Sequence, residues 1–273
     1  MRYKVSRFLL AFAISSACAG WAGEYRTTRY EDKLIHLYRA DPAELSLHWK
    51  GDDEKPVRTF KALRGHLETD GSRVTFLMNA GIFEPGHVPS GLHIQDGKEL
   101  LPLNLEPGEG NFFLKPNGVF LVGKEGAEIL ASEDYENRKG APPRFALQSG
   151  PLLLRAGGVH PKFRPMSDSL LHRNGVGVLP NGSVLFAMTD LAPEHWINLY
   201  SFAMLFKALR CENALFLDGD LSTMWVLQAD GTIQPPDMRP GVQREIAPGM
   251  AADDEFAAMF AIRIPPLGKA DPE

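Results

Sequence analysis

Three turn dipeptides, each lying between apolar segments, constrain the fold of this chain more than any other feature of its sequence. Asp96-Gly97 lies within LHIQDGKEL, Asn117-Gly118 within FFLKPNGVFLV, and Asn181-Gly182 within VGVLPNGSVLFAM. Such dipeptides supply the positive φ angles that tight hairpin turns need, so each predicts a pair of antiparallel strands. The 26 glycines and 21 prolines indicate many further turns, and therefore many short strands.

Helical periodicity is clear in one segment and weaker in a second. Residues 198–211 (NLYSFAMLFKALRC) carry apolar side chains at three- and four-residue spacing behind Asn198, the expected N-cap. Residues 58–71 predict a short helix that leads into a turn. Residues 73–83 and 145–154 are apolar at consecutive positions, as expected of buried strands. The predicted fold class is α+β, with a central mixed or mostly antiparallel sheet, several hairpins and few helices in a single domain.

The first 19 residues are typical of a secretory signal. Three basic residues precede the apolar stretch FLLAFAISSACA, which is too short to span a bilayer, and Ala17–Ala19 fits the small-x-small rule for cleavage after Ala19. A membrane anchor is the alternative. Ser15 stands where a lipobox needs Leu, which argues against a lipoprotein. We therefore expect a periplasmic or secreted protein with no membrane span once the signal is removed.

The mature chain is expected to form one domain with an acidic surface. Residues 20–72 supply N-terminal strands and a short helix, residues 73–264 form the core, and residues 265–273 are a tail. We interpret residues 136–144 (ENRKGAPPR) as a surface loop rather than a linker. Loss of three basic residues with the signal moves the formal charge from −5 to −8. That charge disfavours nucleic acid and anionic membranes as partners.

Polar residues interrupt the apolar pattern at five predicted strand ends. In an α+β sheet, strand ends that share one edge meet around one cleft, so we expect these five groups to converge. The groups are Asn79-Ala80-Gly81, Gly110-Asn111-Phe112, Gln148-Ser149-Gly150, His172-Arg173-Asn174 and Asp218-Gly219-Asp220.

The segments that carry these groups resemble the phosphodiester glycosidase family. The resemblance spans roughly residues 73–226 and rests on five motifs in order: MNAGIF, GNFFLKPNGVF, ALQSGPLLL, HRNGVGV and NALFLDGDLS. Members of that family hydrolyse the bond between a sugar anomeric carbon and a phosphodiester oxygen. The resemblance therefore implies a phosphorylated or phosphodiester-linked glycan as the partner of this chain.

Three residues are the candidates for catalysis. Asp218 follows the apolar run Ala214–Leu217, where burial tunes the pKa of a carboxyl group; a simple turn residue is the alternative. Asp190 matches a family aspartate near the site and is the candidate second carboxylate. Arg173 is the candidate phosphate ligand, because a planar guanidinium grips two phosphate oxygens at once. A surface ion pair is the alternative for Arg173, and we expect His172 to be solvated.

Seven further residues are expected to bind substrate through amides, hydroxyls or closely approaching backbone. For the asparagines, a role as turn residues held by local bonds is the alternative. The serines are not expected to be nucleophiles, since no His is placed to form a triad with them. The seven are Asn79, Asn111, Gln148, Ser149, Gly150, Asn174 and Ser222.

The chain departs from the family pattern at one loop. The typical loop reads Leu-Asp-Gly-Gly-Gly-Ser, and here Asp220 and Leu221 replace the last two glycines. A carboxylate beside a phosphate site repels the substrate unless it turns away or binds a cation. No cofactor is expected, although Asp218, Asp220 and Asn213 carry oxygens of the kind that Ca²⁺ or Mg²⁺ prefers. A non-catalytic module that binds envelope glycans and a metal-dependent phosphodiesterase that cuts the P–O bond are the alternative functions.

Overall fold

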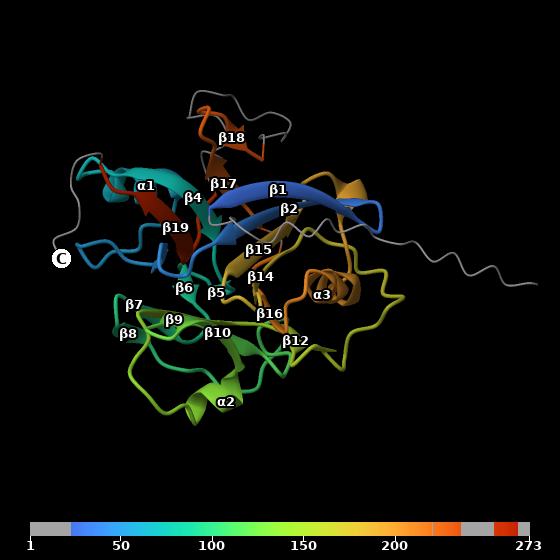
Figure 1. The fold of residues 1–273 in the computed structure, drawn as a ribbon. Helices are drawn as coiled ribbons and strands as arrows, with labels where there is room; N and C mark the ends of the chain where they lie inside the picture. Colours follow the sequence, from blue (N-terminus) through green and yellow to red (C-terminus); the bar gives the residue numbers. More distant parts are fainter. Residues whose placement is uncertain (1–22, 220, 236–253, 267–273) are drawn as a thin grey trace, which may run out of the picture.

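The computed structural model describes residues 23–219, 221–235 and 254–266 (Figure 1). The predicted signal sequence, Asp220 and residues 267–273 of the predicted tail lie outside the described residues. In the described ranges, every strand pair is antiparallel and there are three α-helices, which confirms the prediction of a mostly antiparallel fold with few helices. The strands are distributed over three larger sheets rather than one central sheet.

The largest sheet has seven strands and joins the N-terminal strands of the described chain to strands from residues 152–216. Its strands β2 (Lys33–Ala40) and β15 (Val184–Thr189) pair over six residues, from Ile35 opposite Thr189 to Ala40 opposite Val184. In spatial order the strands are β1 (Glu24–Tyr30), β2 (Lys33–Ala40), β15 (Val184–Thr189), β14 (Asn174–Val178), β16 (Asn213–Phe216), β12 (Leu152–Arg155) and β13 (Gly158–Val159).

Two five-stranded sheets and one small hairpin complete the β-structure. The first sheet contains β10 (Gly126–Ala131), β9 (Gly118–Gly123), β11 (Phe145–Ser149), β7 (His93–Gln95) and β8 (Lys98–Leu101). The second contains β18 (Ile233–Gln234), β17 (Met224–Leu227), β4 (Arg73–Asn79), β19 (Met259–Ile264) and β3 (Leu45–His48). The hairpin consists of β5 (Phe83–Glu84) and β6 (Val88–Pro89).

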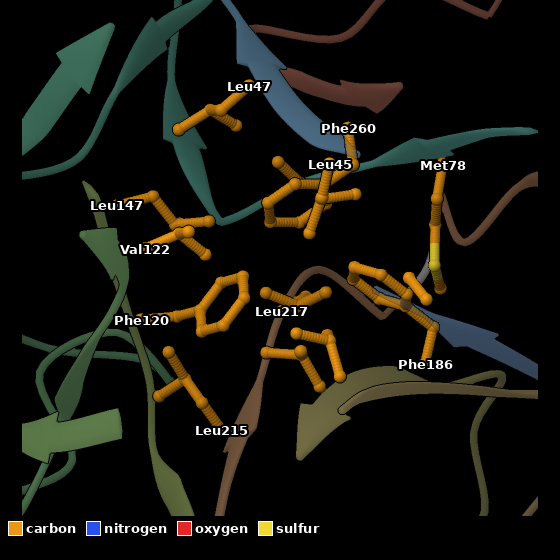
Figure 2. Packing of buried hydrophobic residues seen from close by; sticks show 14 of the residues in the cluster. Leu45, Leu47, Met78, Phe120, Val122, Leu147, Phe186, Leu215, Leu217 and Phe260 are labelled. Carbon is orange, nitrogen blue, oxygen red and sulfur yellow. The ribbon is translucent and has the colours of Figure 1, made fainter. Parts of the chain in front are cut away.

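The main apolar core lies between these three sheets. Figure 2 shows side chains from all three pointing toward one another, with Phe120 and Leu147 from one five-stranded sheet, Phe260 from the other, and Leu215 from the seven-stranded sheet. Each of these side chains is at least 97% buried. Because residues alternate between faces along a strand, neighbouring residues such as Phe216 project to the opposite face of the seven-stranded sheet.

That opposite face is covered by α3 (Leu199–Ala208), as Figure 1 shows. Asn198 caps the helix, accepting a hydrogen bond from the Ser201 N–H at 2.8 Å, which confirms the predicted N-cap. The predicted helix within residues 58–71 is α1 (Phe60–Leu67), which packs on the outer side of β4. The short helix α2 (Ser132–Glu136) and the 3₁₀ turn η1 (Pro193–His195) were not predicted. In the part of the chain that the structure describes, no helix has the length and apolar character needed to cross a bilayer.

Two of the three predicted hairpins are confirmed. Asp96-Gly97 joins β7 to β8, and Asn181-Gly182 joins β14 to β15. The prediction for Asn117-Gly118 is wrong, because Gly118 begins β9 and the hairpin follows that strand, between Gly123 and Gly126. Asn117 is buried, and its Nδ2 donates to the Phe112 carbonyl at 2.8 Å. Its amide therefore holds the preceding loop and does not form a turn.

The single strand predicted over residues 145–154 is in fact two strands in different sheets. β11 ends at Ser149, the chain turns at Gly150-Pro151, and β12 begins at Leu152 in the seven-stranded sheet. This crossing brings the polar residues at the end of β11 beside the strand ends of the seven-stranded sheet. Residues 137–144 form the predicted surface loop.

Candidate functional site

The candidate catalytic residues lie at one edge of the seven-stranded sheet. Strands β15, β14 and β16 are neighbours and antiparallel, with Asn174 opposite Met188 and Gly175 opposite Phe216. The end of β15, the start of β14 and the end of β16 therefore share the same edge. Arg173 and Asp218, which belong to two of the five strand-end groups expected to converge, lie at this edge, and Asp190 follows the end of β15 at the same edge.

A buried amide network joins this edge to the end of β4. Asn174 Nδ2 donates to Asn79 Oδ1 at 2.9 Å, and the Thr223 N–H donates to the same oxygen at 2.8 Å. The Asp218 N–H donates to Asn174 Oδ1 at 2.9 Å. Since a backbone N–H only donates, these contacts fix the orientation of both side-chain amides. The network holds the loop that carries Asp218 between two sheets.

One donor of this network is left over. Asn79 Nδ2 is buried and has no hydrogen-bond partner within the described part of the chain. A buried amide hydrogen without an acceptor costs free energy, so such groups call for an explanation. Asn79 therefore retains a donor beside the Asp218 loop, as expected of a residue that contacts an oxygen-rich ligand.

Ser149 and Gly150 bring the end of β11 to the same place. Ser149 Oγ donates to the Leu217 carbonyl at 3.1 Å, immediately before Asp218. A Cβ atom at Gly150 would lie 2.8 Å from the Phe112 carbonyl and 3.2 Å from the Asn111 carbonyl, so only glycine permits this close approach. The exposed Asn111 is thus held near the site through its backbone.

Gln148 faces away from this network. Its side chain is buried and uses four hydrogen bonds, to the N–H groups of Leu92 and Asn104, the Asn104 carbonyl and Ser132 Oγ. These contacts hold the segment after β8 and favour a structural role. A groove of about 1050 Å³ lies on that side of the sheet, lined in part by Leu92, Asn104 and Tyr135.

His172 and Ser222 link two loops of the site. His172 is buried, so the expectation of a solvated ring is wrong. Its Nε2 lies 3.0 Å from the Ser222 carbonyl and its Nδ1 2.9 Å from Thr189 Oγ1. Burial lowers the pKa of His172, so the neutral ring donates from Nε2 and accepts at Nδ1. Ser222 Oγ donates to the Asp218 carbonyl at 2.8 Å, which ties the loop to itself.

Arg173 lies beneath the site and not on the molecular surface. Only 2% of it is exposed, so Arg173 is not the solvated surface residue considered as the alternative from the sequence. Its Nε donates to the Ile197 carbonyl at 2.7 Å and one Nη to the Ser169 carbonyl at 3.1 Å. The guanidinium also lies 5.6 Å from the centre of the Phe216 ring. Arg173 therefore anchors two neighbouring loops and places a positive charge close to the start of β14.

Asp190 is held by two residues that the sequence did not reveal. His36 Nε2 lies 3.0 Å from Asp190 Oδ2, and the Tyr25 hydroxyl lies 2.6 Å from His36 Nδ1. The Ala192 N–H donates to Asp190 Oδ1 at 2.9 Å. Although burial opposes ionisation, the Ala192 and His36 hydrogen bonds outweigh it and lower the pKa of Asp190. A His inside the apolar run LIHLY indicates a buried polar group in the sequence but does not identify Asp190 as its partner.

The geometry does not assemble the metal ligands considered from the sequence. Asn213 begins β16 and therefore lies at the opposite end of that strand from Asp218. Its Oδ1 accepts from the Ala156 N–H at 2.8 Å. Asp220, the third residue of that group, lies outside the described residues. Across the described ranges, His, Cys, Asp and Glu form no group of three or more that could hold a metal ion.

Comparison with known proteins supports the resemblance seen in the motifs. The phosphodiester glycosidase family model matches residues 72–252. The uncharacterised protein YigE of Escherichia coli strain K12 is 34% identical over 195 residues, covering 70% of this chain and 74% of its own. The catalytic domain of zebrafish N-acetylglucosamine-1-phosphodiester alpha-N-acetylglucosaminidase, solved in a form auto-inhibited by its pro-peptide, is similar in fold with a TM-score of 0.57. That likeness has 16% identity and covers 88% of this chain and 81% of the zebrafish chain.

The family match includes every strand that contributes to the amide network, from β4 to β17. It also includes Arg173, Asp190 and Asp218, together with the loops that hold them. The extent of this match and the identity with YigE lead to one conclusion. This chain is a member of the phosphodiester glycosidase family.

Proposed function

We propose that this protein is an exported hydrolase that cleaves the glycosidic C–O bond of a sugar-1-phosphodiester. The observation that carries the proposal is the hydrogen-bonded chain Asn79–Asn174–Asp218, which gathers polar residues from two sheets at one edge. The family match supports the reaction class. The name of the zebrafish relative suggests an N-acetylglucosamine-1-phosphodiester as the first substrate to test.

In this proposal the two carboxylates act on the anomeric carbon and its attacking water. Asp218 is the main carboxylate, because its loop is fixed by the amide network. Asp190 is the partner, and the hydrogen bonds that lower its pKa keep it ionised near neutral pH. Glycosidases pair two carboxyl groups across the scissile bond to activate water and to stabilise an oxocarbenium-like transition state.

The phosphate side of the reaction needs stabilisation of negative charge more than it needs a strong acid, because a phosphodiester is a good leaving group. Arg173 supplies a positive charge from a buried position next to the start of β14. Its burial and its bonds to two carbonyls favour action through its charge over a direct bidentate grip. The amide of Asn79 and backbone N–H groups of the surrounding loops would donate to phosphate or sugar oxygens.

The test compares Asp218→Asn, Asp190→Asn and Asp134→Asn in the mature protein with N-acetylglucosamine-1-phosphate esters as substrates. Asp134 is an exposed carboxylate on α2, paired with Arg155 at 2.7 Å, and serves as the matched control. Loss of a catalytic carboxylate is expected to lower kcat/KM by about 100-fold or more, with unchanged urea midpoints. Unchanged turnover in a folded Asp218→Asn variant would remove Asp218 from the chemistry.

A panel of sugar-1-phosphodiesters separates the hydrolase from a binding module. Turnover of any member by the wild-type protein supports the hydrolase. Saturable binding without turnover across the whole panel, measured by calorimetry, would instead establish a glycan-binding module. The replacement of two family glycines by Asp220 and Leu221 is the sequence feature that motivates this comparison.

A further inference from the structure

The side chains of Tyr25 and His36 form a hydrogen-bonded chain that ends on Asp190. The Tyr25 hydroxyl is 2.6 Å from His36 Nδ1, and His36 Nε2 is 3.0 Å from Asp190 Oδ2. Both residues come from the N-terminal strands β1 and β2, outside the residues that the family model matches. His36 is 3% exposed, whereas 24% of the Asp190 side chain is open to solvent. The buried His36 ring therefore lies between the hydroxyl of the half-buried Tyr25 and a carboxylate that is partly open to solvent.

We propose that Tyr25 and His36 are positioning residues that fix the ionised state and the direction of the Asp190 carboxylate. This inference rests on the proposed function, in which Asp190 is the second carboxylate of the hydrolase. The carboxylate oxygens are both held, Oδ2 by His36 and Oδ1 by the Ala192 N–H. A carboxylate gripped at both oxygens keeps one orientation, and rigid support of this kind is what a catalytic group requires.

The hydrogen-bond donors and acceptors can be assigned along the whole chain. Asp190 is ionised and only accepts, so the contact at 3.0 Å requires a proton on His36 Nε2. Burial lowers the pKa of His36, so the ring is neutral and Nδ1 is an acceptor. Burial also raises the pKa of Tyr25, so its hydroxyl keeps the proton that it donates to Nδ1. The Tyr25 hydroxyl thus selects the one neutral tautomer of His36 that donates to Asp190.

Other titratable groups lie near Tyr25, His36 and Asp190 on neighbouring segments. His195 of η1 and His172, which precedes β14, both interact electrostatically with His36 or Asp190. The charges on Glu194 and Lys33 lie on the exposed side, where Lys33 Nζ donates to the Glu194 carbonyl at 2.7 Å. Within the described residues, the hydrogen bond to Asp190 Oδ2 comes from His36 Nε2 and not from any of these groups.

The first test is spectroscopic and needs neither a substrate nor a variant. Long-range ¹H–¹⁵N spectra of the mature wild-type protein at pH 7 report which ring nitrogen of each histidine carries the proton. We expect His36 as the Nε2–H tautomer, with Nδ1 shifted as a hydrogen-bond acceptor. An Nδ1–H tautomer or a protonated ring at pH 7 would overturn the assignment.

The second test uses Tyr25→Phe, His36→Leu and His36→Gln, with Tyr30→Phe as the control on the same strand. Titration of the Asp190 carboxyl by ¹³C NMR is expected to show its pKa raised in Tyr25→Phe and raised further in His36→Leu. Gln retains an amide donor near the Nε2 position, so His36→Gln is expected to show a smaller rise in the Asp190 pKa than His36→Leu. Tyr30→Phe is expected to leave the titration unchanged. An Asp190 titration that is the same in His36→Leu and in the wild type would end the proposal.

Activity measurements separate this inference from the proposed function. On an N-acetylglucosamine-1-phosphate ester, the acidic limb of the kcat/KM profile is expected to move upward by the change in the Asp190 pKa. Each pKa unit corresponds to about a tenfold loss of kcat/KM at pH values below the limb. Shifted NMR titrations together with no wild-type turnover of any sugar-1-phosphodiester in the panel would refute the hydrolase and leave the support of Asp190 intact. Normal turnover whose pH profile is unmoved in His36→Leu would refute the positioning role.

Discussion

Asn174 donates its side-chain Nδ2 to Asn79 Oδ1 at 2.9 Å, and this bond joins the start of β14 in one sheet to the end of β4 in another. Both side chains are at least 99% buried. A buried amide pair between sheets costs desolvation unless its geometry is satisfied, so the contact fixes how the two strand ends meet. Through Asn174 Oδ1 the same contact sets the position of the Asp218 backbone.

Replacing Asn174 by Ala is expected to lower the free energy of unfolding by about 1–3 kcal/mol. The change leaves the Asp218 N–H without its acceptor and removes the link to Asn79, and buried groups left unpaired cost about that much. Urea denaturation at pH 7.5 measures the loss. Asn137→Ala, which removes one exposed bond from Nδ2 to the Glu133 carbonyl at 3.0 Å, is the control and should stay within about 0.5 kcal/mol of wild type. Equal effects of the two variants would contradict the role given to Asn174.

Two glycine substitutions are expected to change stability in opposite directions. A Cβ at Gly150 would lie 2.7 Å from Asn117 Cβ and 2.8 Å from the Phe112 carbonyl, so Gly150→Ala forces the backbone apart and should cost about 1–3 kcal/mol. Gly65 lies within α1 with nothing within 4 Å of its Cβ position, so Gly65→Ala should stabilise the protein by about 0.5–1 kcal/mol. Thermal and urea unfolding measure both. Destabilisation by Gly65→Ala would contradict the free space beside Gly65, and an unchanged stability in Gly150→Ala would contradict the close backbone contact at Gly150.

Local chemistry allowed the hairpins at Asp96-Gly97 and Asn181-Gly182 to be predicted, because Asp96, Gly97 and Gly182 adopt the positive φ that such turns need. The same reasoning failed at Asn117-Gly118, where the asparagine side chain donates to the carbonyl of Phe112 in the preceding loop. The prediction of one strand over residues 145–154, made from consecutive apolar residues, was wrong because the chain leaves one sheet for another at Gly150-Pro151. Neither a sheet change nor a buried side-chain bond has a signature in residue order alone.

Much of the candidate site was predictable because polar residues at the ends of apolar strands are unusual. The convergence of Asn79, Ser149, Asn174 and Asp218 follows from that pattern together with antiparallel pairing. The contact between His36 and Asp190 was not predictable, since 154 residues separate the two in sequence. Only the pairing of β2 with β15 brings them together.

Chelation and isotope labelling are expected to give results typical of a glycosidase. In the proposed reaction, water attacks the anomeric carbon and the phosphoester leaves with its oxygen. Hydrolysis in H₂¹⁸O should therefore place the label on sugar C1. Dialysis against EDTA should leave kcat within about twofold of its value before dialysis, a small change compared with the loss of a catalytic group. Mass spectrometry of both products locates the label. Label in the phosphate, together with loss of activity on chelation, would establish the metal-dependent P–O cleavage considered from the sequence.

Two buried histidines in the region of β3 and β7 are expected to make the protein sensitive to acid. Burial lowers the pKa of His48 to about 4, against the opposing charge of Asp96, and lowers that of His93 to about 3 with a further contribution from His48. Neither ring nitrogen of His93 has a hydrogen-bond partner in the described ranges of the chain. The folded protein therefore resists protonation of both rings, whereas the unfolded chain takes up protons near pH 6.5.

The direction of the pH dependence follows from these pKa values. Above pH 6.5 both rings are neutral in both states, and their contribution to stability is complete. As the pH falls from 6.5 toward 4 and 3, only the unfolded chain binds protons, so the free energy of unfolding decreases by about 1.4 kcal/mol per pH unit for each histidine. Urea midpoints at pH 7.5, 6, 5 and 4 should trace this fall.

His93→Leu is expected to flatten the pH dependence while leaving stability at pH 7.5 nearly unchanged, because the substitution leaves no hydrogen-bond partner unsatisfied within the described residues. Its matched control is Ile94→Val, a buried change on the same strand that removes one methylene and no titratable group. Ile94→Val should lower stability by about 0.5–1.5 kcal/mol at every pH and keep the wild-type slope. If His93→Leu retains the wild-type slope between pH 6.5 and 4, His93 is not a source of the acid sensitivity.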